Sequence, residues 1–144
     1  MDIKIKKLTN TAMIPTLGSK DSAGVDLAAD ISDKVLIKPH ETVKIPTGLA
    51  MALPENTFGA IFARSGLATK QSLRPANCVG VIDRDYRGEI IVALHNDGDE
   101  TRIIEPNQRI AQLVVMPYIS INFIESENLD DTDRGNGGFG STGE

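Results

Sequence analysis

The stretch GVIDRDYRGEIIVALHN, Gly80–Asn96, is the part of the chain around which the rest of its chemistry is organised. Val81 and Ile82 are β-branched, as strand residues often are, and Asp83–Gly88 is polar and ends in glycine. Glu89–Leu94 then returns to an apolar, strand-like run. Two apolar runs separated by a polar segment that ends in glycine predict a β-hairpin.

The predicted hairpin allows two interpretations. It places one carboxylate, Asp83, at its mouth and a second, Asp85, at its tip. A hairpin could therefore hold the flat edge of a ligand between two rows of backbone N–H and C=O groups while one carboxylate acts as a base. Alternatively, the two aspartates simply bond to the backbone of their own turn. Taken alone, the segment favours the second interpretation.

Composition limits the protein to a small number of classes. With 144 residues, the chain is long enough for one domain with its own core and too short for two comfortable ones. Hydrophobic residues make up 40% of the chain but aromatic residues only 4%, so the core must consist of Ile, Val, Leu and Ala. The net charge of −5 argues against a surface that binds nucleic acid along its phosphates.

Cysteine and histidine are too few for cross-links or transition-metal sites. The single cysteine, Cys78, excludes an internal disulfide, and we expect it to be a buried structural thiol. His40 and His95 are too far apart in sequence to suggest a metal cage. The N-terminal MDIKIKKLTN has no apolar signal core, and no run approaches the ~20 apolar residues that span a membrane. We therefore expect a cytoplasmic protein with no membrane partner.

Strand patterns dominate the chain, with one exception. Short apolar or alternating runs predict strands at residues 3–8, 35–37, 42–45, 49–53, 58–63, 102–104 and 110–116. The segment SGLATKQSL, residues 65–73, instead predicts a helix with Ser65 as its N-cap. The start of that helix, with Arg64 beside it, favours an anion. An ordinary capped helix with a solvated arginine is an equally good interpretation.

Two polar residues interrupt apolar surroundings. In DSAGVDLAAD, residues 21–30, Gly24 permits close backbone approach and Asp26 sits in an apolar setting. A carboxylate there is costly unless it meets a cation or several donors. Gln112 interrupts the run IAQLVVM, so its amide should either be exposed at an edge or be hydrogen-bonded to a specific partner.

The C-terminal segment differs in composition from the rest. From residue 126 onward it is polar, acidic and finally glycine-rich, so we expect it to be mobile when no ligand is bound. In RGNGGFGSTG, residues 134–143, the glycines free the backbone N–H groups to wrap an anion. Phe139 is suited to stacking on a base, which is worth ~1–3 kcal/mol. The run is not a nucleotide P-loop, because the lysine is missing. A floppy linker is the alternative, and it would leave Arg134 and Phe139 without a role.

Five segments, in order along nearly the whole chain, resemble the motifs of the trimeric deoxyuridine triphosphatases, the dUTPase family. They are AGVDL (23–27), ARSGLA (63–68), NCVGVIDRDYRG (77–88), RIAQLVV (109–115) and RGNGGFGSTG (134–143). The resemblance implies an all-β fold, a distorted jelly-roll-like β-barrel with one short helix over residues 1–125, followed by a flexible arm over 126–144. It further implies a homotrimer with shared active sites, Mg²⁺ as cofactor, and hydrolysis of dUTP to dUMP and pyrophosphate, which limits uracil incorporation into DNA and supplies dUMP for thymidylate synthesis.

The resemblance also implies roles for individual residues. Asp83 resembles the general base that activates water against the α-phosphorus, and Tyr86 the residue whose ring packs under the sugar and leaves no room for a 2′-hydroxyl. The uracil edge would meet Asn77 and backbone groups of Val81, Ile82 and Ile91. The phosphates would meet Arg64, Ser65, Gly66 and Gln112. The closing arm would use Arg134, Phe139, Gly140, Ser141 and Thr142. Asp26 would support the site close to Arg64 or the metal-bound waters. The metal would be held mainly through substrate phosphates and water, with no direct protein ligand assigned.

Two other functions stay open at this stage. One is a dCTP deaminase of the same superfamily, alone or bifunctional, although the glycine arm with its phenylalanine fits the hydrolase better. The other is a catalytically silent β-scaffold or regulatory binding protein. The presence of Asp83, Gln112 and Arg134 argues against lost catalysis.

Overall fold

The structure is a computed structural model that describes residues 2–138 of the chain. This part contains eleven strands and one helix, which confirms the all-β prediction with one short helix. The elements are β1 (Lys4–Lys7), β2 (Gly24–Ala28), β3 (Val35–Ile37), β4 (Thr42–Pro46), β5 (Leu49–Ala52), β6 (Thr57–Phe62), α1 (Ser65–Gln71), β7 (Leu73–Pro75), β8 (Gly80–Ile82), β9 (Ile91–Asn96), β10 (Arg102–Ile104) and β11 (Arg109–Pro117).

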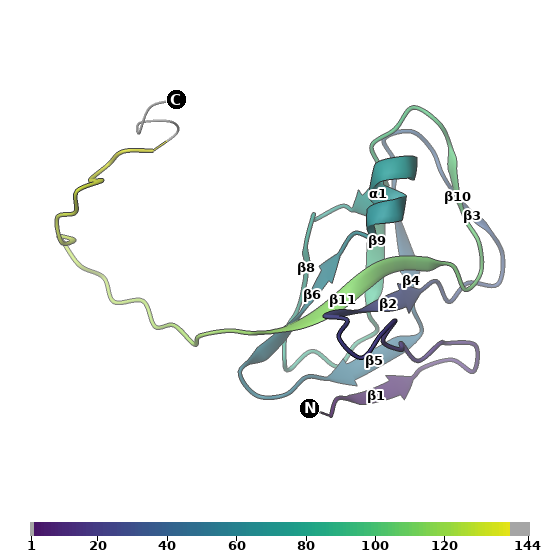
Figure 1. Ribbon diagram of the computed structural model, residues 1–144, viewed down its shortest axis with the longest axis horizontal. Helices are drawn as coiled ribbons and strands as arrows, with labels where there is room; N and C mark the ends of the chain where they lie inside the picture. Colours follow the sequence, from purple (N-terminus) through teal and green to yellow (C-terminus); the bar gives the residue numbers. More distant parts are fainter. Residues whose placement is uncertain (1, 139–144) are drawn as a thin grey trace.

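The strands form four antiparallel sheets around one core. The largest has the order β2-β11-β6-β8, and a second has the order β4-β9-β7. The pairs β1-β5 and β3-β10 complete the body. In Figure 1 the long strand β11 crosses the middle of the body, and α1 lies at its upper end. The arrangement is the expected distorted, jelly-roll-like one, although no single ladder closes into a continuous barrel over residues 2–138.

Aliphatic side chains fill the core, as the low aromatic content predicts. The largest fully buried hydrophobic side chains are Leu27, Ile37, Ile45, Leu49, Leu73, Ile90, Leu94, Ile104, Ile110 and Val92. Fully burying one such side chain stabilises the fold by ~1.5–3 kcal/mol. The core members come from both larger sheets and from the two strand pairs, so one apolar cluster holds all four sheets together.

The predicted hairpin is wrong in its pairing. Its first arm, β8, pairs with Gly59–Ile61 of β6, whereas its second arm, β9, is the central strand between β4 and β7. A period-2 pattern states which face of a strand is buried but not which strand lies beside it. The loop between the arms is also too long to force them together as a tight turn would. As a result the arms diverge into two sheets, and β8 is left as an edge strand.

The helix prediction needs a smaller correction. The N-cap is Arg64 rather than Ser65, and it makes no side-chain capping bond. Arg64 is extended (φ −79°, ψ 129°), and its carbonyl accepts the N–H of Ala68 at 3.0 Å, so Ser65 is already the first helical residue. The helix ends at Gln71, because Ser72 adopts a left-handed conformation with φ 55°.

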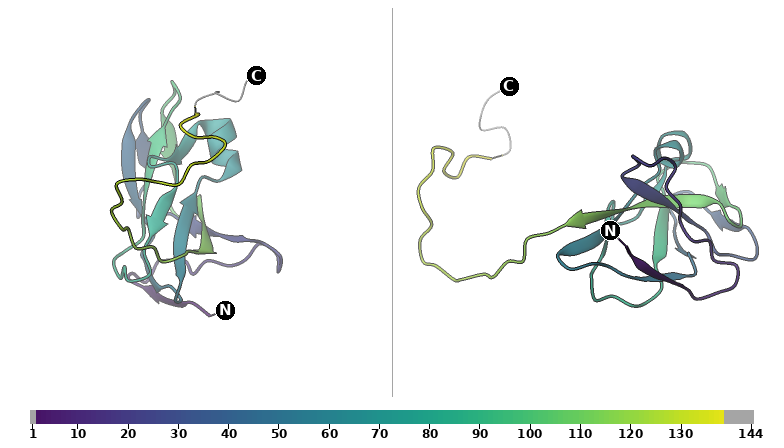
Figure 2. Two further views of the ribbon diagram at one scale, coloured as in Figure 1. Left: turned by 90° about the vertical axis from the view of Figure 1, so that its left-hand side faces the viewer. Right: turned by 60° about the horizontal axis from the view of Figure 1, so that its bottom comes forward.

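After β11 the chain leaves the body. The last backbone bond to the body is from the N–H of Tyr118 to the carbonyl of Asn56, at 3.0 Å. Residues 119–138 then run outward from the body, as Figure 1 and the right-hand view of Figure 2 show, and nearly all of them are exposed. Residues 119–125, which the sequence groups with the β-domain, lie in this same extended segment.

Candidate active site

A cavity of about 180 Å³ lies where β8 and β9 diverge. Its lining residues are Val81, Ile82, Asp83, Tyr86, Glu89 and Ile91. Five of these six are residues to which the family resemblance gives a role toward the base, the sugar or catalysis; the sixth, Glu89, has no assigned role. We call this cavity the slot. Its two walls belong to different sheets, so it is built by the separation of the two arms and not by a paired hairpin.

The loop between the arms is held in shape by its own hydrogen bonds. The N–H of Tyr86 donates to the carbonyl of Asp83 at 3.1 Å, and the Tyr86 hydroxyl donates to the carbonyl of Glu89 at 2.9 Å. The Tyr86 ring lies against Gly88, where an added Cβ would be only 2.6 Å from Cζ. Gly88 is therefore required for the ring position, since any side chain there would displace the tyrosine.

Asp83 lines the slot and has an exposed side chain. It also lines a larger open cavity of about 690 Å³ together with Phe58, Val81, Arg84, Asp85 and Tyr118. Arg84 does not neutralise Asp83, because its Nη2 lies 3.2 Å from Glu55 Oε1. An exposed carboxylate can accept a hydrogen bond from water, which is the geometric requirement for a general base.

Asn77 stands in the turn that precedes β8. Its Nδ2 would lie 3.6 Å from a Cβ at Gly80, so the amide is close to the first residue of the slot strand. The next residue, Cys78, is exposed, which contradicts the expectation of a buried thiol. Cys78 adopts φ 62°, and its N–H donates to the carbonyl of Pro75 at 3.0 Å, so turn geometry overrides the preference of cysteine for the core.

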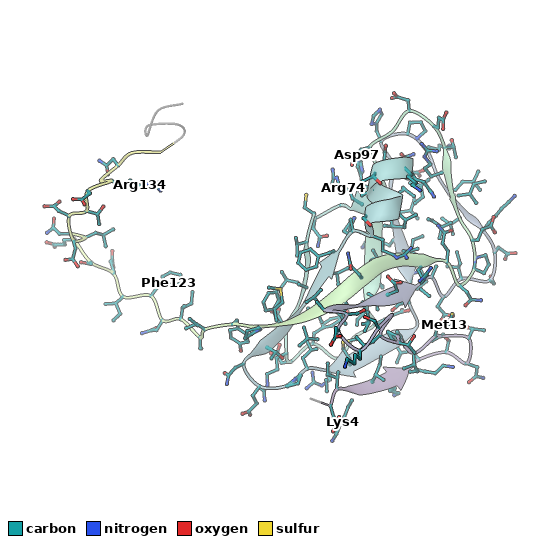
Figure 3. The ribbon with its side chains drawn as sticks, in the orientation of Figure 1. Lys4, Met13, Arg74, Asp97, Phe123 and Arg134 are labelled. Carbon is teal, nitrogen blue, oxygen red and sulfur yellow. The ribbon has the colours of Figure 1, made fainter. Side chains whose placement is uncertain are left out.

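Arg74 anchors this turn. Its Nη1 donates to the carbonyls of Pro75 at 3.1 Å and Ala76 at 3.2 Å, while Nε and Nη2 meet the two carboxylate oxygens of Asp97 at 2.7 and 2.9 Å. Figure 3 shows Arg74 and Asp97 next to each other beside the helix. The hydrogen bond to Asp97 raises the pKa of Arg74 above its ordinary value.

A second group of predicted site residues gathers around the centre of β11. Gln112 lies opposite Asp26 of β2 on one side and opposite Phe62 of β6 on the other. Asp26 meets the cations that its setting demands: Oδ1 lies 2.8 Å from Arg64 Nε, and Oδ2 lies 3.1 Å from Arg109 Nη1. The expected closeness of Asp26 to Arg64 is confirmed.

Gln112 is half-buried and has a specific partner, as one of its two sequence interpretations requires. Its Nε2 donates to the carbonyl of Ala63 at 2.9 Å, which fixes the residue just before Arg64. Ser65 and Gly66 follow at the exposed start of α1, and an added Cβ at Gly66 would meet no atom within 4 Å. We use the name Arg64 cluster for the group formed by Arg64, Ser65, Gly66, Gln112 and Asp26.

The structure keeps three sets of predicted site residues apart in one chain. No member of the Arg64 cluster lines the slot. Arg134 lies far out on the extended C-terminal segment, as Figure 3 shows, in a turn where the N–H of Gly137 donates to its carbonyl at 3.0 Å. The other predicted arm residues, Phe139, Gly140, Ser141 and Thr142, lie outside the described residues.

Sequence reasoning missed two residues with evident contacts. Arg109 begins the fourth motif. The signal available for it was its positive charge, because Asp26 in the first motif needs a cation or several donors. Glu89 directly follows the polar segment of the slot loop, and its sequence context predicts only the start of a strand. Its contacts depend on a turn at Gly48, more than forty positions away, that no local pattern reveals.

Neither a metal cage nor a membrane span is found in the described part of the chain. Over residues 2–138, no three or more His, Cys, Asp or Glu side chains are grouped so that they could hold a metal ion. Within the same range, no helix has the length and apolar character needed to cross a bilayer.

Comparison with known proteins decides the family. The sequence model of the dUTPase family matches residues 10–143. The chain belongs to the dUTPase family. Among curated dUTPases, it is 51% identical over 131 residues to the deoxyuridine 5′-triphosphate nucleotidohydrolase of Desulfitobacterium hafniense (strain DSM 10664 / DCB-2), covering 90% of this chain and 87% of the relative. It is 49% identical over 142 residues to the enzyme of the same name from Rickettsia bellii (strain OSU 85-389), covering 98% and 95%.

Solved dUTPases share the fold. The dUTPase of Staphylococcus bacteriophage 80alpha with dUpNHpp superimposes with a TM-score of 0.89 at 27% identity, covering 99% of each chain. The dUTPase of phage phi11 of S. aureus superimposes with a TM-score of 0.82 at 23% identity, covering 92% of this chain and 100% of that one. The family resemblance carried by the five motifs is therefore confirmed.

Proposed function

We propose that this chain hydrolyses dUTP to dUMP and pyrophosphate, with Asp83 as the general base that activates water against the α-phosphorus. The observation that carries the proposal is the slot, where Val81, Ile82, Asp83, Tyr86 and Ile91 line one cavity. Membership of the dUTPase family supports it, as does the likeness to a dUTPase solved with the dUTP analogue dUpNHpp.

Uracil recognition follows from the edge character of β8. An edge strand keeps one row of backbone N–H and C=O groups free of strand partners, and uracil offers a complementary polar edge. Val81 and Ile82 supply these groups on β8, with the Asn77 amide nearby. Across the slot, the backbone of Ile91 contributes from the end of β9 that β7 does not pair with. Cytosine presents the opposite donor pattern on that edge, and a site of this kind can reject it by ~10⁴-fold. The methyl group of thymine would clash with the slot walls.

The phosphates are proposed to meet the Arg64 cluster. A triphosphate carries about four negative charges, and an acidic protein needs locally focused cations to hold it. Arg64, fixed by Asp26, and the donors at Ser65, Gly66 and Gln112 supply this at the start of α1, with Arg134 brought in by the arm. Once bound in line with a water molecule, the α-phosphorus needs little more than a base within ~3 Å of that water.

Mg²⁺ is the proposed cofactor, held mainly by the phosphate oxygens and water. This mode suits a chain whose described residues offer no cluster of three metal-ligating side chains, because Mg²⁺ often binds through substrate phosphates and keeps several waters. When bound, the ion would neutralise part of the phosphate charge that builds up during the reaction.

We further propose a homotrimer with active sites shared between subunits. In a single chain the slot, the Arg64 cluster and Arg134 lie apart. One complete site therefore requires residues from more than one copy of the chain, or a large movement of the segments that carry these residues. The extended segment also exposes apolar side chains, with Ile119 87%, Phe123 89% and Ile124 84% exposed. Such a segment favours a partner surface. Residues 126–144 are proposed as the arm that closes over base and γ-phosphate.

The deaminase alternative has less support. A deaminase needs an acid/base group facing the exocyclic amine of cytosine. Besides Asp83, the slot is lined by one other carboxylate, Glu89, and its Oε1 already accepts the N–H of Gly48 at 2.8 Å.

The deciding experiment compares pyrophosphate release from dUTP, dTTP, dCTP and UTP in the presence of Mg²⁺. We expect rapid release from dUTP alone. Ammonia release from dCTP, without pyrophosphate release from dUTP, would instead establish the deaminase, and no reaction with any nucleotide would favour the silent scaffold.

In the cell, the hydrolysis would limit uracil incorporation into DNA and supply dUMP for thymidylate synthesis. A cytoplasmic location stays a prediction.

A further inference from the structure

Glu89 makes two different hydrogen bonds, one through its side chain and one through its main chain. Its side-chain Oε1 accepts the N–H of Gly48 at 2.8 Å, and its main-chain carbonyl accepts the hydroxyl of Tyr86 at 2.9 Å. The residue is half-buried and lines the slot. One residue therefore joins the tyrosine expected to contact the sugar to a turn in the body of the protein.

The turn that receives Glu89 is firmly built. Gly48 lies between β4 and β5, is buried, and adopts φ 65°. An added Cβ there would lie 2.7 Å from Ala12 Cβ and 2.8 Å from Thr9 Oγ1, so Gly48 is closely surrounded. Its carbonyl accepts the N–H of Leu8 at 2.7 Å. Such a turn cannot shift to follow a moving loop, so it is a fixed reference point for Glu89.

The residue after Glu89 is fixed to the same turn. The Thr47 hydroxyl donates to the carbonyl of Ile90 at 2.7 Å, and the N–H of Ile90 donates to the carbonyl of Leu49 at 2.8 Å. Glu89 and Ile90 thus share three hydrogen bonds with residues 47–49. The Ile90 N–H belongs to the same peptide group as the Glu89 carbonyl that accepts the Tyr86 hydroxyl, so the bond to Leu49 holds that carbonyl through the backbone. The Glu89 carboxylate adds a second, side-chain connection from the same residue to the turn, at the N–H of Gly48.

We propose that Glu89 is a positioning residue for nucleotide specificity: by fixing the Tyr86 ring relative to the Thr47–Leu49 turn, it sets the clearance under the sugar that separates dUTP from UTP. This inference rests on the proposed role of Tyr86. The tyrosine is 44% exposed, so packing alone does not hold its ring. Loss of the carboxylate also leaves the buried Gly48 N–H without its partner, which favours rearrangement of the loop that carries Tyr86.

The test measures kcat/KM for dUTP and for UTP in the full-length enzyme, with the thermal unfolding midpoint of each variant. Glu89→Ala removes the acceptor, whereas Glu89→Gln keeps an oxygen that can accept the Gly48 N–H. Tyr86→Phe removes only the hydroxyl that meets the Glu89 carbonyl. Glu41→Ala is the matched control, because its Oε2 accepts the N–H of Lys38 at 2.7 Å in a turn outside the slot.

We expect Glu89→Ala and Tyr86→Phe each to lower the preference for dUTP over UTP at least about tenfold. Glu89→Gln and Glu41→Ala should keep the preference within about twofold of the parent enzyme. A folded Glu89→Ala enzyme with the parental preference would overturn the inference. If Glu89→Ala does not fold, Tyr86→Phe decides alone, and an unchanged preference in that variant has the same consequence.

Tyr86→Ala separates this inference from the role proposed for Tyr86 itself. If Tyr86→Ala lowers the preference and Glu89→Ala does not, only the positioning role of Glu89 fails. If Tyr86→Ala also leaves the preference unchanged, the sugar contact of Tyr86 fails and the role of Glu89 fails with it.

Discussion

Arg64 Nε lies 2.8 Å from Asp26 Oδ1, so the arginine that precedes the only helix of the described residues is held by a carboxylate of β2. Both side chains are less than one-third exposed, at 27% and 30%. Asp26 also meets Arg109 at 3.1 Å. The carboxylate therefore keeps two like charges close together at the place where phosphates are proposed to bind.

Asp26→Asn should lower both stability and activity. Without the negative charge, Arg64 and Arg109 lose a charge-assisted partner, and we expect a loss of about 1–3 kcal/mol in the free energy of unfolding. Because Arg64 would no longer be held in one orientation, kcat/KM for dUTP should fall about 10–100-fold. Urea denaturation and steady-state kinetics measure these two effects. Glu100→Gln, which breaks an ion pair with Arg102 outside the site, is the control and should leave kcat/KM unchanged. An Asp26→Asn enzyme with parental kcat/KM would contradict the proposed role.

Arg74→Lys should weaken substrate binding more than turnover. Lysine cannot bond Asp97 in a bidentate manner while also holding the carbonyls of Pro75 and Ala76, so the turn that carries Asn77 loses its anchor. We expect KM for dUTP to rise about tenfold with little change in kcat. The pKa of Arg74 is raised above an already high value, so its positive charge persists across the neutral pH range. The stability that this charge contributes would be lost only as the pH rises through the raised pKa of Arg74. Equal losses in kcat and kcat/KM with an unchanged KM would show that Arg74 does not act through the Asn77 turn.

Gly48→Ala should strongly destabilise the fold. The position combines φ 65° with contacts that an added Cβ would bring too close to Ala12 and Thr9. We expect a loss of at least about 2 kcal/mol in the free energy of unfolding, measured by chemical denaturation. Gly66→Ala is the contrasting variant, because its Cβ would meet open space within a helix and should stabilise by up to ~1 kcal/mol. Similar effects of the two substitutions would argue against the geometry described for Gly48.

Removing residues 134–144 should leave a folded protein with little turnover of dUTP. The described part of this segment makes no contact with the sheets, so the unfolding midpoint should change little, while the arm that brings Arg134 and Phe139 to the nucleotide is lost. Phe139→Ala in the full chain should weaken nucleotide closure in the same direction but less severely. Circular dichroism and kinetics compare the variants. Unfolding of the truncated chain would contradict the assignment of a separate closing arm.

Local chemistry made some features predictable from the sequence. Asp26 in an apolar run had to meet a cation or several donors, and Gln112 in another had to find a partner or an edge, because burying either group alone is costly. Both expectations hold at Arg64, Arg109 and the carbonyl of Ala63. The aliphatic core and most strand positions were likewise predictable, since they depend on residue type and short periodicity.

Long-range choices were not predictable in the same way. The alternation of β8 and β9 fixed their buried faces, but their partners β6, β4 and β7 are chosen by packing across the whole chain. Cys78 is exposed because a left-handed turn outweighs the usual preference of a thiol for the core. The contact of Glu89 is not predictable from local sequence, because only the folded chain brings the N–H of Gly48 to 2.8 Å from its Oε1.

The most direct test of the account is the comparison of dUTP binding and turnover in Asp83→Asn. Asparagine keeps the shape of the side chain that lines the slot but cannot act as a base. The Kd for dUpNHpp should therefore stay within about threefold of the parent, while kcat for dUTP falls by several orders of magnitude, roughly 10³-fold or more. Equal loss of binding and turnover would show that Asp83 shapes the slot instead of activating water. Near-parental turnover would show that the base lies elsewhere.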